Sequence, residues 1–178
     1  MAASNPNLRF DPPSAERLAC LSAAALDERL DEEIGRAERH GTELSCLLVV
    51  IDNLEEISRE HGSELPEQTL AYVGVALLRE LRRFDRVGRP GGGELLVVLP
   101  GADGPRGEMV ARRVLDRVRA IKVEADGERR PLRVSVGLAA WRRDSGRHDL
   151  MGRARAATRV RNGENGPSGI ANAVPPAR

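Results

Sequence analysis

Three glycines and an acid in the middle of this 178-residue chain have types and spacing that could serve chemistry. They are Gly91, Gly92, Gly93 and Glu94, and the apolar run Leu95–Leu99 follows them. Consecutive glycines form a turn that reaches positive φ and leave bare backbone that a ligand can approach closely. Such a turn is either a phosphate cradle or a tight hairpin without a ligand, and glycine alone favours the plain hairpin. The surrounding residues must decide between the two.

Those surroundings resemble the signature hairpin of the GGDEF (diguanylate cyclase) family. That family has Gly-Gly-Asp/Glu-Glu-Phe between two β-strands, whereas this chain has Gly93 at the first acidic position and Leu95 in place of Phe. Further matches follow in the family's order over residues 15–166. The resemblance implies an α/β fold with a central, mostly antiparallel five-stranded sheet flanked by helices, like the palm of nucleotide cyclases.

The resemblance also implies a catalytic site that has lost acids. In the family an Asp-x-Asp pair ends the first strand, and its first Asp is a ligand for the magnesium ions bound to GTP. Here the sequence reads Val50-Ile51-Asp52, which keeps only the second acid. Magnesium requires hard oxygen ligands, and a valine offers none. Gly93 also lacks a carboxylate, so the chain poorly supports a metal-assisted attack of the 3′-hydroxyl of one GTP on the α-phosphate of another. We therefore expect that the protein requires no cofactor, and that magnesium matters only if it is an active cyclase.

Other positions implied by the resemblance would contact the nucleotide. The two that would contact the guanine base fall on Ser58 and Glu67. Glu67 keeps a carboxylate that can accept from a guanine edge, whereas Ser58 is a weak substitute for the family's Asn. The lysine that would neutralise the GTP phosphates falls on Val160 or Asn162. The catalytic cleft is therefore expected to be degenerate.

A second set of residues matches the family better. Arg82-x-x-Asp85 matches the R-x-x-D product-inhibition site, where cyclic di-GMP binds away from the active centre, and Arg113 falls at that site's second arginine. An arginine fork pairs with phosphate or with the Hoogsteen edge of guanine, and a carboxylate accepts from guanine N–H groups. A plainer interpretation stays open. Arg82 in a last helical turn complements the macrodipole, and Arg113 can pair with Asp116.

Apolar periodicity predicts the elements that position these residues. Leu44–Ile51 is a continuous apolar run, typical of a central strand, and helical stripes place Phe84 and Met109 inward. The expected elements are a helix from Ala15, capped by Ser14, through Leu18 and Leu21 to His40; the strand Leu44–Ile51; a helix Glu67–Phe84; the glycine hairpin; a helix from Pro105 to Ile121; a turn at Asp126-Gly127; a strand Leu132–Ala139; a helix Asp149–Arg161; and an edge strand at Gly169–Ala171.

The composition, 40% hydrophobic with a net charge of +1, predicts one globular domain. We expect a disordered lead over residues 1–14, the domain over 15–172 and a flexible tail over 173–178. Arginines interleaved with acids argue against nucleic-acid binding. No apolar run is long enough for a membrane span and no signal pattern is present, which predicts a cytoplasmic protein. Cys20 and Cys46 lack metal-binding spacing and are expected to be reduced and structural.

Three functional hypotheses follow. The first is a catalytically inactive regulatory module that binds cyclic di-GMP through Arg82, Asp85 and Arg113, with ligand-dependent homodimerisation as an extension. Its input would come from a separate, unidentified protein partner, from ligand or from expression level. The second is a residually active diguanylate cyclase that uses Asp52, Glu67 and Glu94 with magnesium. The third is a protein-interaction domain that binds no nucleotide.

Overall fold

The computed structural model describes residues 20–162 and 170–172. In chain order its elements are α1 (Ala23–His40), β1 (Leu44–Ile51), α2 (Leu54–His61), α3 (Glu64–Glu80), β2 (Arg86–Gly91), β3 (Glu94–Pro100), α4 (Gly104–Arg119), β4 (Lys122–Ala125), β5 (Glu128–Pro131), β6 (Val134–Ala140), α5 (Arg147–Asn162) and β7 (Ile170–Asn172).

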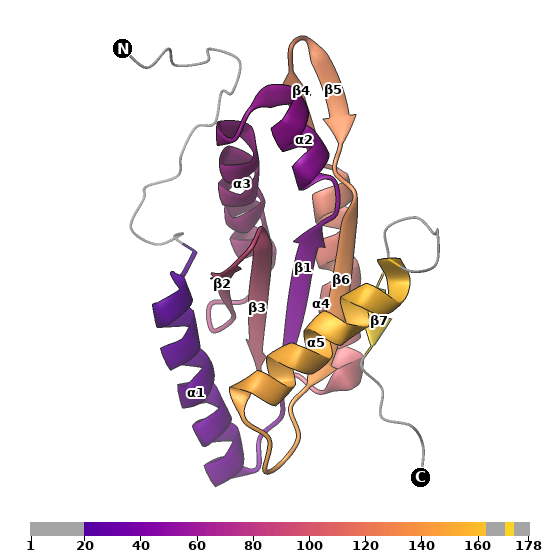
Figure 1. Ribbon diagram of the computed structural model, residues 1–178. Coiled ribbons are helices and arrows are strands. Elements are labelled where there is room, and N and C mark those ends of the chain that lie inside the picture. Colours follow the sequence, from indigo (N-terminus) through magenta and orange to yellow (C-terminus); the bar gives the residue numbers. More distant parts are fainter. Residues whose placement is uncertain (1–19, 163–169, 173–178) are drawn as a thin grey trace.

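A sheet with the strand order β2-β3-β1-β6-β7 forms the centre of the fold (Figure 1). The neighbouring strands run antiparallel except for β6 and β7, which are parallel. β1 lies in the middle of this sheet, as its continuous apolar run predicts, because a strand covered on both faces has no polar side to present. The mostly antiparallel α/β fold expected from the sequence is therefore confirmed.

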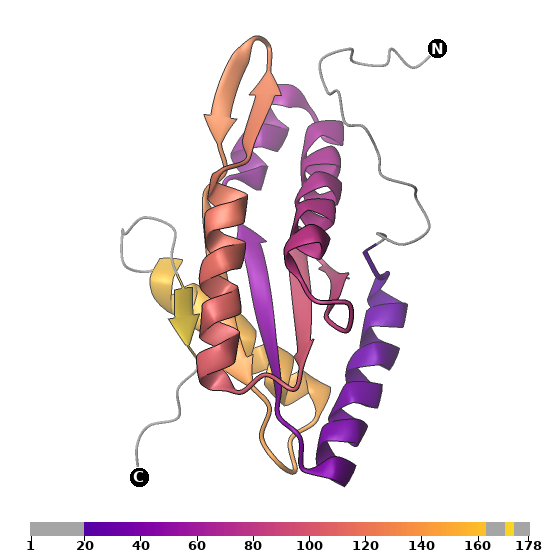
Figure 2. The ribbon, with the colours of Figure 1, turned by 180° about the vertical axis from the view of Figure 1, so that it is seen from behind.

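Alternate residues of β1 divide the core into two layers. Leu47, Val49 and Ile51 pack in the cluster formed with α2, α3 and α4, whereas Cys46 and Leu48 pack in the cluster formed with α1 and α5. Figure 1 shows α5 crossing one face of the sheet, and Figure 2 shows α3 and α4 covering the other. Because side chains alternate along a strand, one run of apolar residues serves both layers.

The first helix begins later than the sequence pattern suggests. Ser22 caps α1, its Oγ accepting the N–H of Ala25 at 3.3 Å. Leu21, expected on the helical stripe, is instead extended: it donates its N–H to the Val87 carbonyl, at 2.9 Å, and forms a parallel bridge with Gly88. That part of the prediction was wrong because Leu21 pairs with β2. The cap expected at Ser14 and the helical position Leu18 lie outside the described residues.

The helix expected over Glu67–Phe84 also has different ends. α3 spans Glu64–Glu80, and Leu81 follows it in an extended conformation. The carboxylate of Asp85 accepts the N–H of Arg82 at 2.8 Å, which closes a turn where a further helical turn would have formed. Phe84 is therefore 70% exposed rather than inward.

The expected inward position of Met109 was wrong as well. Met109 is 65% exposed, because the stripe of α4 that meets the sheet consists of other residues. Those buried residues are Gly107, Ala111, Val114, Leu115 and Val118. The expected helix over residues 105–121 is otherwise confirmed, ending two residues early.

The remaining expected elements are present. The Asp126-Gly127 turn joins β4 to β5, and this hairpin extends beyond one end of the sheet beside α2 (Figure 1). Trp141 packs at the end of β6, and Cys20 and Cys46 are free thiols. β7 is an edge strand, as expected, and Gly169, where that strand was expected to begin, lies outside the described residues. Within the described ranges, no helix combines the length and apolarity that crossing a bilayer demands.

Candidate functional site

The glycine hairpin forms as the sequence predicts. Gly91, Gly92 and Gly93 have φ values of +117°, +63° and +76° and join β2 to β3. A Cβ at Gly91 or Gly92 would meet no atom within 4 Å, so the backbone conformation, rather than crowding, requires glycine at these two positions. At Gly93 a Cβ would lie 3.2 Å from the Leu54 side chain. The hairpin thus holds Glu94 at the start of β3.

Glu94 lies directly across from Val50 in the β1–β3 register. Its carboxylate is held by Arg155 of α5, with Nη2 to Oε2 at 2.6 Å and Nε to Oε1 at 3.2 Å. Hydrogen bonding to Glu94 raises the pKa of Arg155 above its ordinary value. A fixed cation on α5 therefore neutralises the acid that the sequence analysis assigned to the catalytic cleft.

Asp52 follows β1 and is exposed. Its Oδ2 accepts a hydrogen bond from Ser135 Oγ at 2.8 Å, and Ser135 is the β6 partner of Val50. Across the parts of the chain that the structure describes, no three or more His, Cys, Asp and Glu side chains are grouped so that they could hold a metal ion. The residues present fit magnesium poorly, because the Val50 side chain, opposite Glu94, is hydrocarbon and Glu94 is already paired with Arg155.

The two predicted guanine contacts lie on different helices. Ser58 is half-buried on α2, and Glu67 is exposed on α3. The carboxylate of Glu67 is engaged by Arg89 of β2 at 2.8 and 3.0 Å. This hydrogen bond and the charge of Arg89 hold the pKa of Glu67 below its ordinary value. A guanine at Glu67 would have to compete with Arg89 for the same oxygens.

Asp85 occupies the centre of the other candidate site. It is 7% exposed, its Oδ2 accepts the N–H of Arg82, and its own N–H donates to the Arg82 carbonyl at 3.0 Å. Burial raises the pKa of Asp85, while the hydrogen bond from Arg82 and the charges of Arg82, Arg113 and Arg86 oppose that rise. The structure thus brings together three residues from α4 and the α3–β2 turn that the sequence analysis grouped. We call Arg82, Asp85, Arg86 and Arg113 the arginine site.

The arginines of this site differ in their partners. Arg86 donates from Nη1 to the carbonyls of Arg83 and Asp85, at 2.7 and 2.8 Å. Arg82 and Arg113 are exposed, and neither guanidinium makes a hydrogen bond or ion pair to another described residue. The alternative pairing of Arg113 with Asp116 is not formed in the described structure. Three cations therefore surround one carboxylate, which leaves the site with excess positive charge.

Comparison with known proteins identifies the family. The model of the diguanylate cyclase, GGDEF domain, matches residues 21–165. The chain belongs to the GGDEF domain family.

Among curated GGDEF proteins, diguanylate cyclase DgcP of Pseudomonas aeruginosa is 30% identical over 118 residues, which cover 66% of this chain and 18% of DgcP. Diguanylate cyclase DosC of Escherichia coli K12 is 35% identical over 110 residues, covering 61% of this chain and 24% of DosC. The chain thus spans a quarter or less of the length of these relatives.

Solved GGDEF structures agree with the fold. Diguanylate cyclase SiaD of Pseudomonas aeruginosa, in complex with its activator SiaC, superposes with a TM-score of 0.79 at 28% identity, covering 85% of this chain and 58% of SiaD. The GGDEF domain of DgcB from Caulobacter crescentus, in complex with c-di-GMP, gives a TM-score of 0.80 at 21% identity, covering 93% and 98% of the two chains.

Sequence reasoning missed the arginines that neutralise the acids of the GGDEF cleft. Arg155 lies on α5, seven residues before Asn162, which is one of the two positions expected for a phosphate-neutralising lysine. That spacing was a signal that could have identified it. Arg89 gave no such signal, because its pairing with Glu67 depends on how α3 lies against β2.

Proposed function

We propose that this GGDEF domain is catalytically inactive and acts as a regulatory module that binds cyclic di-GMP at the arginine site. One observation carries the proposal: two exposed arginines, Arg82 and Arg113, flank the buried carboxylate of Asp85, and their guanidinium groups have no hydrogen-bonding partner among the described residues. The ligand carries two phosphates and two guanines. Its anionic groups would complete the unused donors, and Asp85 would accept from guanine N–H groups.

The charge of the site supports an anionic ligand. Arg82 lies in the α3–β2 turn and Arg113 lies on α4. An ion pair between Glu80, at the end of α3, and Arg117, one turn after Arg113, joins the two helices at 3.6 Å. Guanidinium groups from two elements can therefore hold one ligand between them. The GGDEF domain of DgcB was solved in complex with c-di-GMP, which agrees with a ligand of this class.

The state of the other cleft supports inactivity. Val50 and Gly93 provide no side-chain oxygen ligands, and Arg155 engages Glu94 through two hydrogen bonds. A cyclase mechanism that used Asp52, Glu67 and Glu94 would require both Arg155 and Arg89 to release their acids. Because metal-assisted catalysis there would first have to break these two ion pairs, we assign the signalling role to the arginine site.

Isothermal titration of the purified domain with cyclic di-GMP tests the proposal. Arg113→Ala should weaken binding by about 10- to 150-fold, the value of a hydrogen-bonded charge. Arg112→Ala is the matched control, because the neighbouring Arg112 is exposed and pairs with Glu108 on the same helix. Wild-type binding that Arg113→Ala weakens by this factor and Arg112→Ala leaves intact supports the proposal.

Two results would overturn it. If the wild-type protein does not bind cyclic di-GMP, the remaining hypothesis is a domain that acts through protein contacts alone. Consumption of GTP with magnesium in a parallel reaction would instead restore the cyclase hypothesis. Sedimentation with and without ligand then measures whether binding joins two copies.

A further inference from the structure

Phe84 is one of two large apolar side chains that the described fold leaves exposed; Met109 is the other. Most other large apolar residues of the described chain pack in or against the two core clusters. Phe84 lies between Arg83 and Asp85, inside the turn that builds the arginine site. An aromatic ring on the surface forgoes the stabilisation that burial would give, so its position beside a cationic site calls for a physical explanation.

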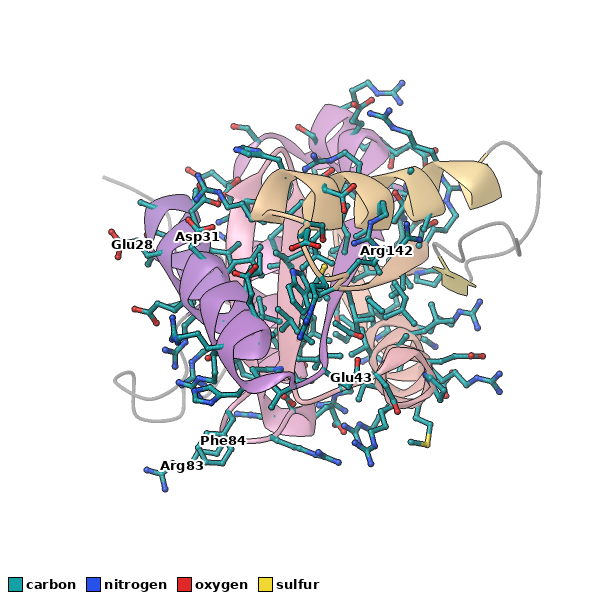
Figure 3. The ribbon with its side chains drawn as sticks, turned by 90° about the horizontal axis from the view of Figure 1, so that it is seen from below. Glu28, Asp31, Glu43, Arg83, Phe84 and Arg142 are labelled. Atoms are coloured by element: carbon teal, nitrogen blue, oxygen red, sulfur yellow. The ribbon has the colours of Figure 1, made fainter. Side chains whose placement is uncertain are left out.

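Hydrogen bonds of the turn fix the backbone that carries this ring. The reciprocal hydrogen bonds of Arg82 and Asp85 close the turn, and Arg86 donates to the carbonyls of Arg83 and Asp85, the residues on either side of Phe84. The backbone that carries the ring is therefore held on both sides. Figure 3 shows Arg83 and Phe84 projecting away from the body of the protein.

We propose that Phe84 is a base-stacking residue of the arginine site, which takes a purine ring of the bound nucleotide against its face. The inference rests on the proposed function and adds a contact to it. Guanidinium groups alone bind any phosphate, whereas an aromatic ring adds attraction for a flat base, because every base has a π face. A backbone that is held before binding lowers the entropy lost when the complex forms.

The chemistry of the ligand follows from this arrangement. Arg82 and Arg113 hold its phosphates, Asp85 accepts from a base edge, and Phe84 covers one base face. A ligand with phosphates and no purine lacks the stacking contact. Inorganic pyrophosphate should therefore bind much more weakly than cyclic di-GMP.

Titration with cyclic di-GMP of the wild-type domain and of Phe84→Ala, Phe84→Trp and Met109→Ala tests the inference. Phe84→Ala should raise Kd by about 5- to 150-fold, the range for loss of one base–aromatic stack. Phe84→Trp should retain affinity, and its added indole fluorescence should be quenched when guanine stacks on it. Met109→Ala is the control for loss of an exposed apolar side chain, and we expect it to change Kd less than twofold.

The outcomes separate this inference from the proposed function. If Phe84→Ala binds cyclic di-GMP as tightly as the wild type, the stacking role is overturned, whereas the proposed binding at the arginine site stands. An equal loss in Met109→Ala also overturns it, because a general apolar contact then explains the effect. Wild-type protein that does not bind overturns both. Circular dichroism of each variant establishes that the fold is retained.

Discussion

The exchange of Val50 for aspartate, combined with removal of Arg155, should create a magnesium site in the cleft. Val50 and Glu94 are directly opposed in the β1–β3 register, so their side chains lie on the same face of the sheet. Side chains opposed in this way have Cβ atoms roughly 4.5–5.5 Å apart, a separation at which two carboxylates can share one divalent cation. Arg155→Ala removes the cation that competes for Glu94.

The size of the effect can be worked from the binding equilibrium. Without metal, two opposed carboxylates repel, which costs roughly 0.2–1 kcal/mol. A weak site with Kd on the order of 1 mM, in about 10 mM magnesium, gains about 1.4 kcal/mol. For a domain of this size that corresponds to a rise in Tm of about 3–6 °C.

Differential scanning fluorimetry with magnesium chloride, and with sodium chloride at equal ionic strength, measures this shift. The Val50→Asp/Arg155→Ala variant should show a magnesium-specific rise, and the wild type should show none. Val50→Asp/Arg159→Ala is the matched control, because Arg159 is exposed on α5 and the change leaves Arg155 in place. An identical rise in the control, or no rise in the Arg155→Ala variant, would refute the claim that Arg155 blocks metal binding at Glu94.

Two further predictions concern Asp85 and the packing of α5. The pKa of Asp85 is raised above its ordinary 3.8, so its contribution to stability is present below 3.8 and lost as the pH rises through the raised value. Cyclic di-GMP needs the ionised carboxylate, so the affinity for the ligand should fall as the pH drops through the raised pKa of Asp85. Ligand titrations at a series of pH values should show this fall for the wild type and not for Asp85→Asn. Gly137→Ala should destabilise the fold by about 1–3 kcal/mol in urea unfolding, since its Cβ would lie 2.1 Å from the Ala154 carbonyl oxygen, and an unchanged midpoint would contradict the close approach of β6 and α5.

Local patterns in the sequence determined the strands, the glycine hairpin and the order of elements. The continuous apolar run of β1 can only be satisfied between two covered faces, and three adjacent glycines permit the positive φ angles of the turn. The grouping of Arg82, Asp85 and Arg113 was also predicted, through the spacing shared with the GGDEF family. Whether that group binds cyclic di-GMP stays a prediction.

Only the tertiary structure decided which charges meet and which apolar residues stay outside. Glu94 and Arg155 are 61 residues apart, and Glu67 and Arg89 are 22 apart. In a chain with 28 basic and 27 acidic residues, periodicity cannot select such pairs, because they depend on how α5 and α3 lie against the sheet. The exposure of Phe84 likewise depends on a side-chain hydrogen bond from the Arg82 N–H to Asp85, which ends the helical path that the apolar stripe alone would have continued.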